Sequence, residues 1–122
     1  MKKIVILLFA FGVLITACQD DDAEVVITVP QEVCDSLDIL YTNDVAPILA
    51  DAGCSGPYCH GSGAGGVTLS DYDNTKTAAE SPKFLKAIKH ESGASSMPKG
   101  GNKLSDPQTE IIECWVKSGS RE

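Results

Sequence analysis

The sequence predicts a small all-α domain of three to four short helices. Apolar residues recur at helical spacing in three segments, and each segment opens with a capping residue or an early proline. Glycine-rich loops join these segments, and no internal repeat is present. Large apolar residues are scarce, with one Trp, three Tyr and three Phe in 122 residues. A core this thin usually needs a disulfide, a metal or a large apolar cofactor to stabilise it.

The first predicted helix covers about residues 44–52. Asn43 or Asp44 can cap its free amide groups, and Pro47 lies early enough in the helix to remove little hydrogen bonding. Gly53 is expected to end it. Its buried face consists of four apolar residues at helical spacing: Val45, Ile48, Leu49 and Ala52.

Two further helices have clear start signals. Ser81 is a capping residue with Pro82 at the first helical position, and the apolar face that follows consists of Phe84, Leu85 and Ile88. The last helix begins at Ser105, with Gln108 as its capping-box partner, and ends at Gly119. Its apolar face consists of Ile111, Ile112, Trp115 and Val116.

A glycine-rich loop joins the first two helices. Residues 61–66 contain four glycines, and residues 67–69 are expected to form a short extended segment. The glycines follow no predicted strand and open no helix, which excludes a phosphate-binding loop. They are better explained as positions where the backbone passes close to a bulky group.

The N-terminus predicts export and a lipid anchor. Lys2 and Lys3 precede an apolar run, residues 4–15, that is too short to span a bilayer. The run ends in Ile15-Thr16-Ala17-Cys18, which resembles a bacterial lipobox, in which the cysteine is lipidated and becomes the mature N-terminus. The alternative is a free cysteine beside an ordinary cleavage site. We therefore predict a signal peptide over residues 1–17 and an anchor at Cys18.

The residues after Cys18 predict a tether. Gln19-Asp20-Asp21-Asp22 is similar to the acidic export tags of surface lipoproteins in Bacteroidetes-like bacteria, although a solvated acidic spacer is the alternative. Residues 18–33 are assigned to this tether and residues 34–122 to the folded domain. The expected location is the periplasmic face or the cell surface of the outer membrane.

Charge narrows the classes of partner. Cleavage after residue 17 removes two of the ten basic residues and none of the 17 acidic ones, which leaves a net charge of −9. Such a chain is a poor ligand for nucleic acid or for anionic lipid. The acidity instead favours a partner protein with a basic docking patch.

The stretch Cys54-Ser55-Gly56-Pro57-Tyr58-Cys59-His60 carries the main chemical signal. Covalent haem attachment needs two thiols for the two vinyl groups and an imidazole for the iron, and Cys54, Cys59 and His60 supply all three. Four residues separate the cysteines here, where the usual motif has two. The alternatives are a Cys54–Cys59 disulfide, or a zinc site with His90 as the fourth ligand.

Met97 is the candidate second iron ligand. It is the only methionine after Met1 and lies in the loop Ser96-Met97-Pro98-Lys99-Gly100-Gly101, where packing has little use for it. A thioether opposite histidine raises the reduction potential of haem iron and suits electron transfer. A simple packing role is the alternative. His90 is a rival ligand, but its setting in Lys89-His90-Glu91 predicts a solvated surface residue.

Residues 41–119 resemble the single-haem cytochrome c domains of planctomycete and Bacteroidetes exported proteins. The matching motifs, in order along the chain, are Val45-Ala46-Pro47-Ile48-Leu49, Cys59-His60-Gly61, Gly66-Val67-Thr68-Leu69 with Tyr72, Met97-Pro98-Lys99-Gly100-Gly101, Leu104-Ser105, Ile112 and Trp115-Val116-Lys117-Ser118-Gly119. The resemblance implies a class I cytochrome c-like fold around one covalent haem c. It also implies thioethers at Cys54 and Cys59, with His60 and Met97 as axial ligands. The widened cysteine spacing departs from the family pattern.

Electron transfer is the function that this resemblance implies. The expected protein is a lipid-anchored electron carrier between exported redox partner proteins and is not itself an enzyme. One alternative is a haem peroxidase or sensor, in which Met97 leaves the iron to admit a ligand. Another is a haem-free, disulfide-stapled lipoprotein that acts as a structural or binding module. If haem replaces the missing core, the haem-free chain should be poorly folded.

Two cysteines remain, Cys34 before the first helix and Cys114 inside the last. In an oxidising exported setting the natural expectation is a disulfide between them. Closing a separation of 80 residues is worth about 4.5 kcal/mol by the chain-entropy estimate. Two free thiols are the alternative.

Overall fold

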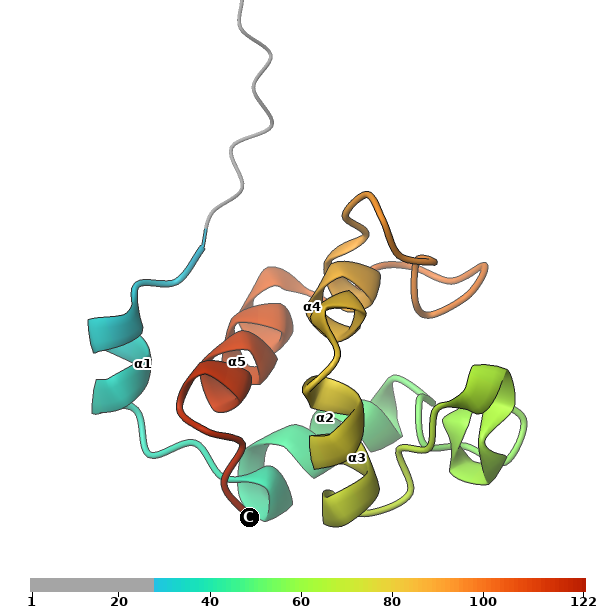
Figure 1. The fold of residues 1–122 in the computed structure, drawn as a ribbon, viewed down its shortest axis with the longest axis horizontal. Helices are drawn as coiled ribbons and strands as arrows, with labels where there is room; N and C mark the ends of the chain where they lie inside the picture. Colours follow the sequence, from blue (N-terminus) through green and yellow to red (C-terminus); the bar gives the residue numbers. More distant parts are fainter. Residues whose placement is uncertain (1–27) are drawn as a thin grey trace, which may run out of the picture.

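The computed structural model describes residues 28–122, so the predicted signal peptide and Cys18 lie outside the described residues. This part of the chain contains α-helices and no strands, which confirms the all-α prediction (Figure 1). The helices are α1 (Gln31–Ser36), α2 (Ala46–Asp51), α3 (Tyr72–Ala79), α4 (Pro82–Lys89) and α5 (Asp106–Lys117). None of these helices is long and apolar enough to cross a membrane.

The first predicted helix begins earlier than expected. A π-helical turn, Tyr41–Val45, runs directly into α2. The prediction that Asn43 or Asp44 caps this helix is wrong, because α2 follows the π-helical turn with Val45 at its N-cap and no side-chain cap. Asp44 Oδ2 instead accepts the Leu40 N–H at 2.8 Å, before the π-helical turn. Gly53 follows α2 with a φ of +72°, a conformation that favours glycine, and so ends the helix as predicted.

The starts of α4 and α5 follow the sequence prediction. Ser81 caps α4 by accepting the Lys83 N–H on its Oγ at 3.3 Å. At α5, the Ser105 N–H donates to Gln108 Oε1 at 3.1 Å, which is the side-chain-to-backbone half of a capping box. Local capping chemistry therefore determines where both helices begin.

Two helices were not predicted. Helix α3 is capped by Asp71, which accepts the Asn74 N–H at 3.0 Å, and it buries Thr75 and Ala79. Those buried side chains are too small and polar to give a clear apolar period. Helix α1 has only six residues and includes the end of the segment that the sequence assigned to the tether. Residues 67–69 form no strand, although Val67 has an extended backbone.

Aromatic residues and the C-terminal tail organise the core. The Tyr41 ring lies 5.8 Å from Trp115 and 5.6 Å from Tyr72, measured between centroids. The Arg121 carbonyl accepts from Trp115 Nε1 at 2.7 Å and from the Tyr41 N–H at 3.0 Å. The wider core comprises Cys34, Ile39, Val45, Ile48, Leu49, Ala79, Ile88, Leu104, Ile112 and Cys114. Helix α5 supplies its centre.

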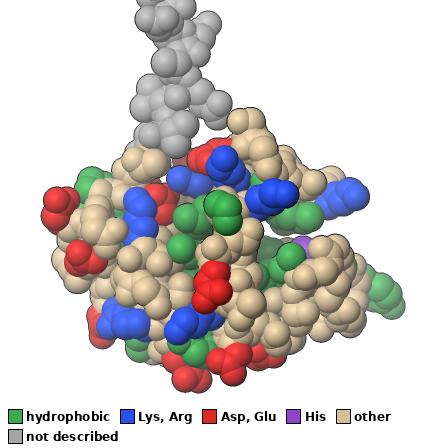
Figure 2. All heavy atoms as spheres, in the orientation of Figure 1, with side chains coloured by type: hydrophobic (Ala, Val, Ile, Leu, Met, Phe, Trp, Pro, Cys, Tyr) green, Lys and Arg blue, Asp and Glu red, His purple; other side chains and the backbone are tan. Residues whose placement is uncertain are grey.

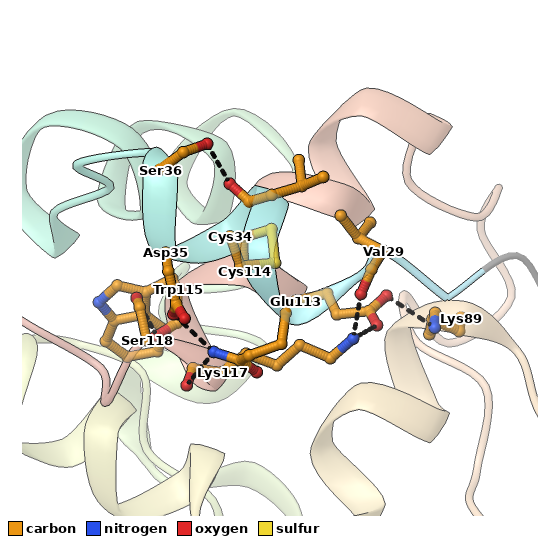
Figure 3. The surroundings of a disulfide bond; sticks show 12 residues. Val29, Cys34, Asp35, Ser36, Lys89, Glu113, Cys114, Trp115, Lys117 and Ser118 are labelled. Atoms are coloured by element: carbon orange, nitrogen blue, oxygen red, sulfur yellow. Dashed lines mark hydrogen bonds and ion pairs between the residues drawn. A yellow bond between two sulfur atoms is a disulfide. The ribbon is translucent and has the colours of Figure 1, made fainter.

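A disulfide joins Cys34 of α1 to Cys114 of α5, the pair expected from the sequence. Beside it, the buried carboxylate of Glu113 accepts from Lys89 Nζ at 2.8 Å and from Lys117 Nζ at 2.7 Å (Figure 3). Lys117 Nζ also donates to the Val29 carbonyl. The N-terminal segment, α4 and α5 are thus tied together at one place.

Candidate functional site

The loop that follows α2 brings Cys54 and His60 together. The His60 N–H donates to the Cys54 carbonyl at 2.9 Å, and the Cys54 N–H donates back to Leu49 of α2 at 2.8 Å. The loop is therefore anchored to α2 at a buried residue, Leu49. His60 begins a 3₁₀ turn, His60–Ser62, that points the chain away from α2.

The extra residues between the two cysteines form a closed bulge. The Gly56 carbonyl accepts from both the Cys59 N–H and the Gly61 N–H, each at 3.0 Å. Tyr58, at the tip, is 97% exposed. The wider spacing is thus accommodated on the solvent side, while Cys54 and His60 stay together at the base of the loop.

Gly61 is required by this closure. A Cβ at position 61 would lie 2.4 Å from the Ser55 carbonyl oxygen and 2.8 Å from the Gly56 carbonyl oxygen. Contacts of this length to backbone atoms are sterically forbidden, so the loop would have to shift. The glycine of the Cys59-His60-Gly61 motif is therefore needed for the shape of the loop itself.

The imidazole of His60 is oriented by the backbone. Its Nδ1 lies 3.1 Å from the Val67 carbonyl oxygen. Because a carbonyl only accepts, Nδ1 must carry a proton, so in the neutral imidazole the lone pair lies on Nε2. The Leu69 N–H also donates to the His60 carbonyl at 2.9 Å. Metal-binding histidines usually have their second nitrogen fixed in this way.

Met97 is held by hydrogen bonds on both sides of its Cα atom. Its N–H donates to the Ala87 carbonyl at 2.9 Å, and its carbonyl accepts from His90 Nε2 at 2.9 Å. The expectation that His90 is a solvated surface residue is wrong, because the side chain is half-buried and hydrogen-bonded. The sequence pattern Lys89-His90-Glu91 gave no sign of a distant backbone acceptor.

A cleft brings the predicted ligands together. It consists of two adjoining cavities of about 430 and 410 Å³, a size typical of small-molecule sites. Figure 2 shows the molecule hollowed on this face, with hydrophobic side chains inside and basic side chains along one lip. The residues that line both cavities are Cys54, His60, Gly65, Met97 and Lys99.

The lining of the cleft contains the types of residue that a haem site would use. The larger cavity is walled by apolar residues from several elements, which are Leu49, Val67, Leu69, Phe84, Ala87 and Ile88. Cys54 and Cys59 lie at the smaller cavity, where thiols could meet the edge of a porphyrin. Lys83 and Lys99 supply positive charge that would match the two propionates. Apolar walls, thiols, an imidazole, a thioether and cations are the groups that this cofactor needs.

The two cysteines of the motif differ in environment. Both are free thiols in the structure, with Cys54 half-buried and Cys59 exposed. Burial raises the pKa of the Cys54 thiol, and the nearby Cys59 adds to the shift. Cys54 is therefore held in its protonated form at neutral pH.

The zinc alternative lacks a ligand set. Among residues 28–122, no three His, Cys, Asp or Glu side chains are grouped so that they could hold a metal ion. In particular, the Nε2 atom of His90 is already used as a donor to Met97. A haem site differs from a zinc site in needing one histidine and a thioether.

Two contributors to the site were missed by sequence reasoning. The Val67 carbonyl orients His60, and His90 holds Met97, and in each case the partner is a backbone oxygen. Backbone acceptors leave no trace in residue identity, so only the fold reveals them.

Comparison with protein-family models, with curated proteins and with solved structures found no match to this chain.

Proposed function

We propose that this domain is a monohaem cytochrome c with a class I-like fold, which carries electrons between exported redox partner proteins from a lipid anchor at Cys18. One observation carries the proposal: His60 and Met97 line the same apolar cleft as Cys54, and the His60 imidazole presents Nε2 as its unprotonated nitrogen.

Each residue has a distinct role in this proposal. Cys54 and Cys59 would form the thioethers, and His60 Nε2 and Met97 Sδ would hold the iron. When bound, the haem iron supplies a one-electron redox couple, and a methionine ligand favours its reduced state. Phe84 and the aliphatic wall exclude water, which also raises the potential.

Partner recognition follows from charge in this proposal. The mature chain has a net charge of −9, so a partner with a basic docking patch would be attracted over long range. The cleft itself is lined by Lys83 and Lys99, and these cations are assigned to the cofactor's carboxylates. The acidic remainder of the surface is then the part that a basic partner would meet.

Retention of haem after denaturation tests the proposal. The full chain is co-expressed with a cytochrome c maturation system, denatured and extracted with acid acetone, and the reduced pyridine spectrum is recorded. We expect the colour to stay with the wild-type polypeptide. Cys54→Ser and Cys59→Ser should each leave a single thioether and shift the band, while Ser62→Ala, an exposed change in the next turn, should match the wild type.

Two results would contradict the proposal. Complete extraction of the colour from the wild type would mean that no thioether forms, and a wild type without colour before extraction would favour the haem-free lipoprotein alternative. Rapid carbon monoxide binding by the reduced wild type would mean that Met97 does not stay on the iron, and would favour a sensor or peroxidase instead.

A further inference from the structure

We propose that His90 is a positioning residue, which ties the loop that carries Met97 to the end of α4 and so keeps the thioether at the cleft. The inference rests on the proposed function for its consequence at the iron. The contact itself, 2.9 Å from His90 Nε2 to the Met97 carbonyl oxygen, is a property of the chain alone.

The direction of this hydrogen bond is fixed. The Met97 carbonyl oxygen can only accept, so His90 Nε2 carries the proton and donates. That nitrogen therefore has no lone pair to offer a metal. His90 is thereby assigned to the support of Met97 and not to the iron through Nε2.

The backbone at His90 points to the same role. His90 is the C-terminal cap of α4 and has a φ of +59° and a ψ of +32°, the left-handed conformation in which helices usually place glycine. A side chain in this conformation costs free energy that glycine would avoid. The imidazole offsets this cost by reaching a carbonyl seven residues further along the chain.

A second hydrogen bond completes the tie. The Met97 N–H donates to the Ala87 carbonyl at 2.9 Å, so both polar backbone groups of Met97 are bound by the last turn of α4. The last turn of α4 is itself fixed to α5, because Lys89 Nζ forms an ion pair with the buried Glu113 Oε2 at 2.8 Å. Met97 is thus attached by two hydrogen bonds to the end of α4, and it lines both cavities of the cleft.

The test compares two changes at one position. His90→Gly removes the imidazole, and glycine adopts the left-handed conformation without the strain of a side chain. Any loss in this variant therefore comes from the missing hydrogen bond and not from a less stable helix end. His90→Gln keeps an N–H donor at similar reach and should restore the tie. Ser92→Ala, an exposed change in the same loop, is the matched control. All variants are made in the full chain.

The first readout needs no cofactor. The Cys34–Cys114 disulfide and the core on α5 are made by the chain alone, so we expect the haem-free chain to keep the last turn of α4 even where haem would complete the core. Because its N–H is bound to Ala87, the Met97 amide of the haem-free chain should be protected from hydrogen exchange. His90→Gly should speed that exchange by about 2- to 12-fold, the range set by the loss of one hydrogen bond, and His90→Gln should largely reverse the effect. Equal exchange in the wild type and His90→Gly would overturn the inference.

The second readout is made on the haem-loaded chain. His90→Gly should weaken the near-infrared absorption band that marks Fe(III)–methionine ligation and should speed carbon monoxide binding by a similar factor, with Met97→Ala as the limiting case. The opposite outcome has two parts: the wild type lacks that band, and His90→Gly opens the iron to carbon monoxide. Together they would show that His90 is the iron ligand and would overturn the inference. If the wild type binds no haem, the proposed function fails, and amide exchange still decides whether the tie exists.

Discussion

The imidazole Nδ1 of His60 lies 3.1 Å from the carbonyl oxygen of Val67. This contact links the two sides of the glycine-rich loop, since the chain leaves His60, passes through residues 61–66 and returns at Val67. The loop therefore does more than connect helices, because the Val67 carbonyl sets the tautomer and orientation of His60, the candidate iron ligand. The tight turn after His60 is what makes the return possible.

Replacing Gly61 by alanine should damage this loop in the haem-free chain. The new Cβ would lie 2.4 Å from the Ser55 carbonyl oxygen, and backbone atoms cannot yield as a flexible side chain can. Overpacking of this kind costs about 1–3 kcal/mol. We expect a lower urea midpoint for Gly61→Ala and less haem retained after maturation. Ser62→Ala is the control, and an unchanged midpoint in Gly61→Ala would show that the loop relaxes freely.

The two free thiols should differ in reactivity. Cys59 is exposed, whereas Cys54 is half-buried and burial raises its pKa. A maleimide reacts with the thiolate, so at neutral pH we expect Cys59 of the haem-free chain to be labelled well before Cys54. Peptide mass spectrometry at a series of times measures both rates. In urea the two rates should converge. Faster labelling of Cys54 in the folded chain would contradict the environment described for this loop.

Removal of the Cys34–Cys114 disulfide should destabilise the domain strongly. The bridge closes a separation of 80 residues and attaches α1 to the buried face of α5. The chain-entropy estimate gives about 4.5 kcal/mol, and loss of a native disulfide from a small exported domain typically costs about 2–5 kcal/mol. Cys34→Ser with Cys114→Ser should lower the urea midpoint accordingly.

The double change Cys54→Ser with Cys59→Ser is the control for that experiment, because it removes as many sulfur atoms and leaves the bridge. Intact mass gives an independent check, since reduction of the unfolded wild type should add two hydrogens. If the mass of the wild type does not change on reduction, the bridge is absent. The prediction that Cys34→Ser with Cys114→Ser lowers stability would then have no basis.

Local signals in the sequence were sufficient where one side chain caps a helix. Ser81 and Ser105 marked the starts of α4 and α5, and Gly53 marked the end of α2, because each acts on backbone within a few residues. Helix α3 escaped prediction because Thr75 and Ala79 make its buried face small and polar. Its capping residue, Asp71, was the signal that could have revealed it.

At the candidate site, too, some residues could be predicted from the sequence and others could not. Cys54, His60 and Met97 were chosen from residue chemistry, and the structure brings them to one cleft. Val67 and the supporting role of His90 could not be chosen, since each contact depends on a backbone carbonyl, that of Val67 in one case and that of Met97 in the other, and every residue has a carbonyl. Supporting contacts of this kind depend on the path of the chain and become visible only once it is folded.

The buried carboxylate of Glu113 should make stability depend on pH. Burial opposes its ionisation, but hydrogen bonds from Lys117 and Lys89 outweigh that effect and hold the pKa of Glu113 below its ordinary value. A group with a lowered folded-state pKa adds stability above its unfolded value of about 4.3, and this stability is lost as the pH falls through the folded-state pKa. Wild-type stability should therefore fall on acidification.

Glu113→Gln isolates this contribution. At neutral pH the variant leaves Lys89 and Lys117 without their carboxylate, which should cost about 1–3 kcal/mol. In acid the wild type loses the same interaction, so the two stability curves should converge as the pH is lowered from neutral to below the unfolded value of about 4.3. Urea unfolding across that range measures both curves, with Glu110→Gln on the exposed face of α5 as the control. Parallel curves would mean that the carboxylate is not ionised in the folded domain, and the contact between Lys89 and Glu113 would then not be an ion pair.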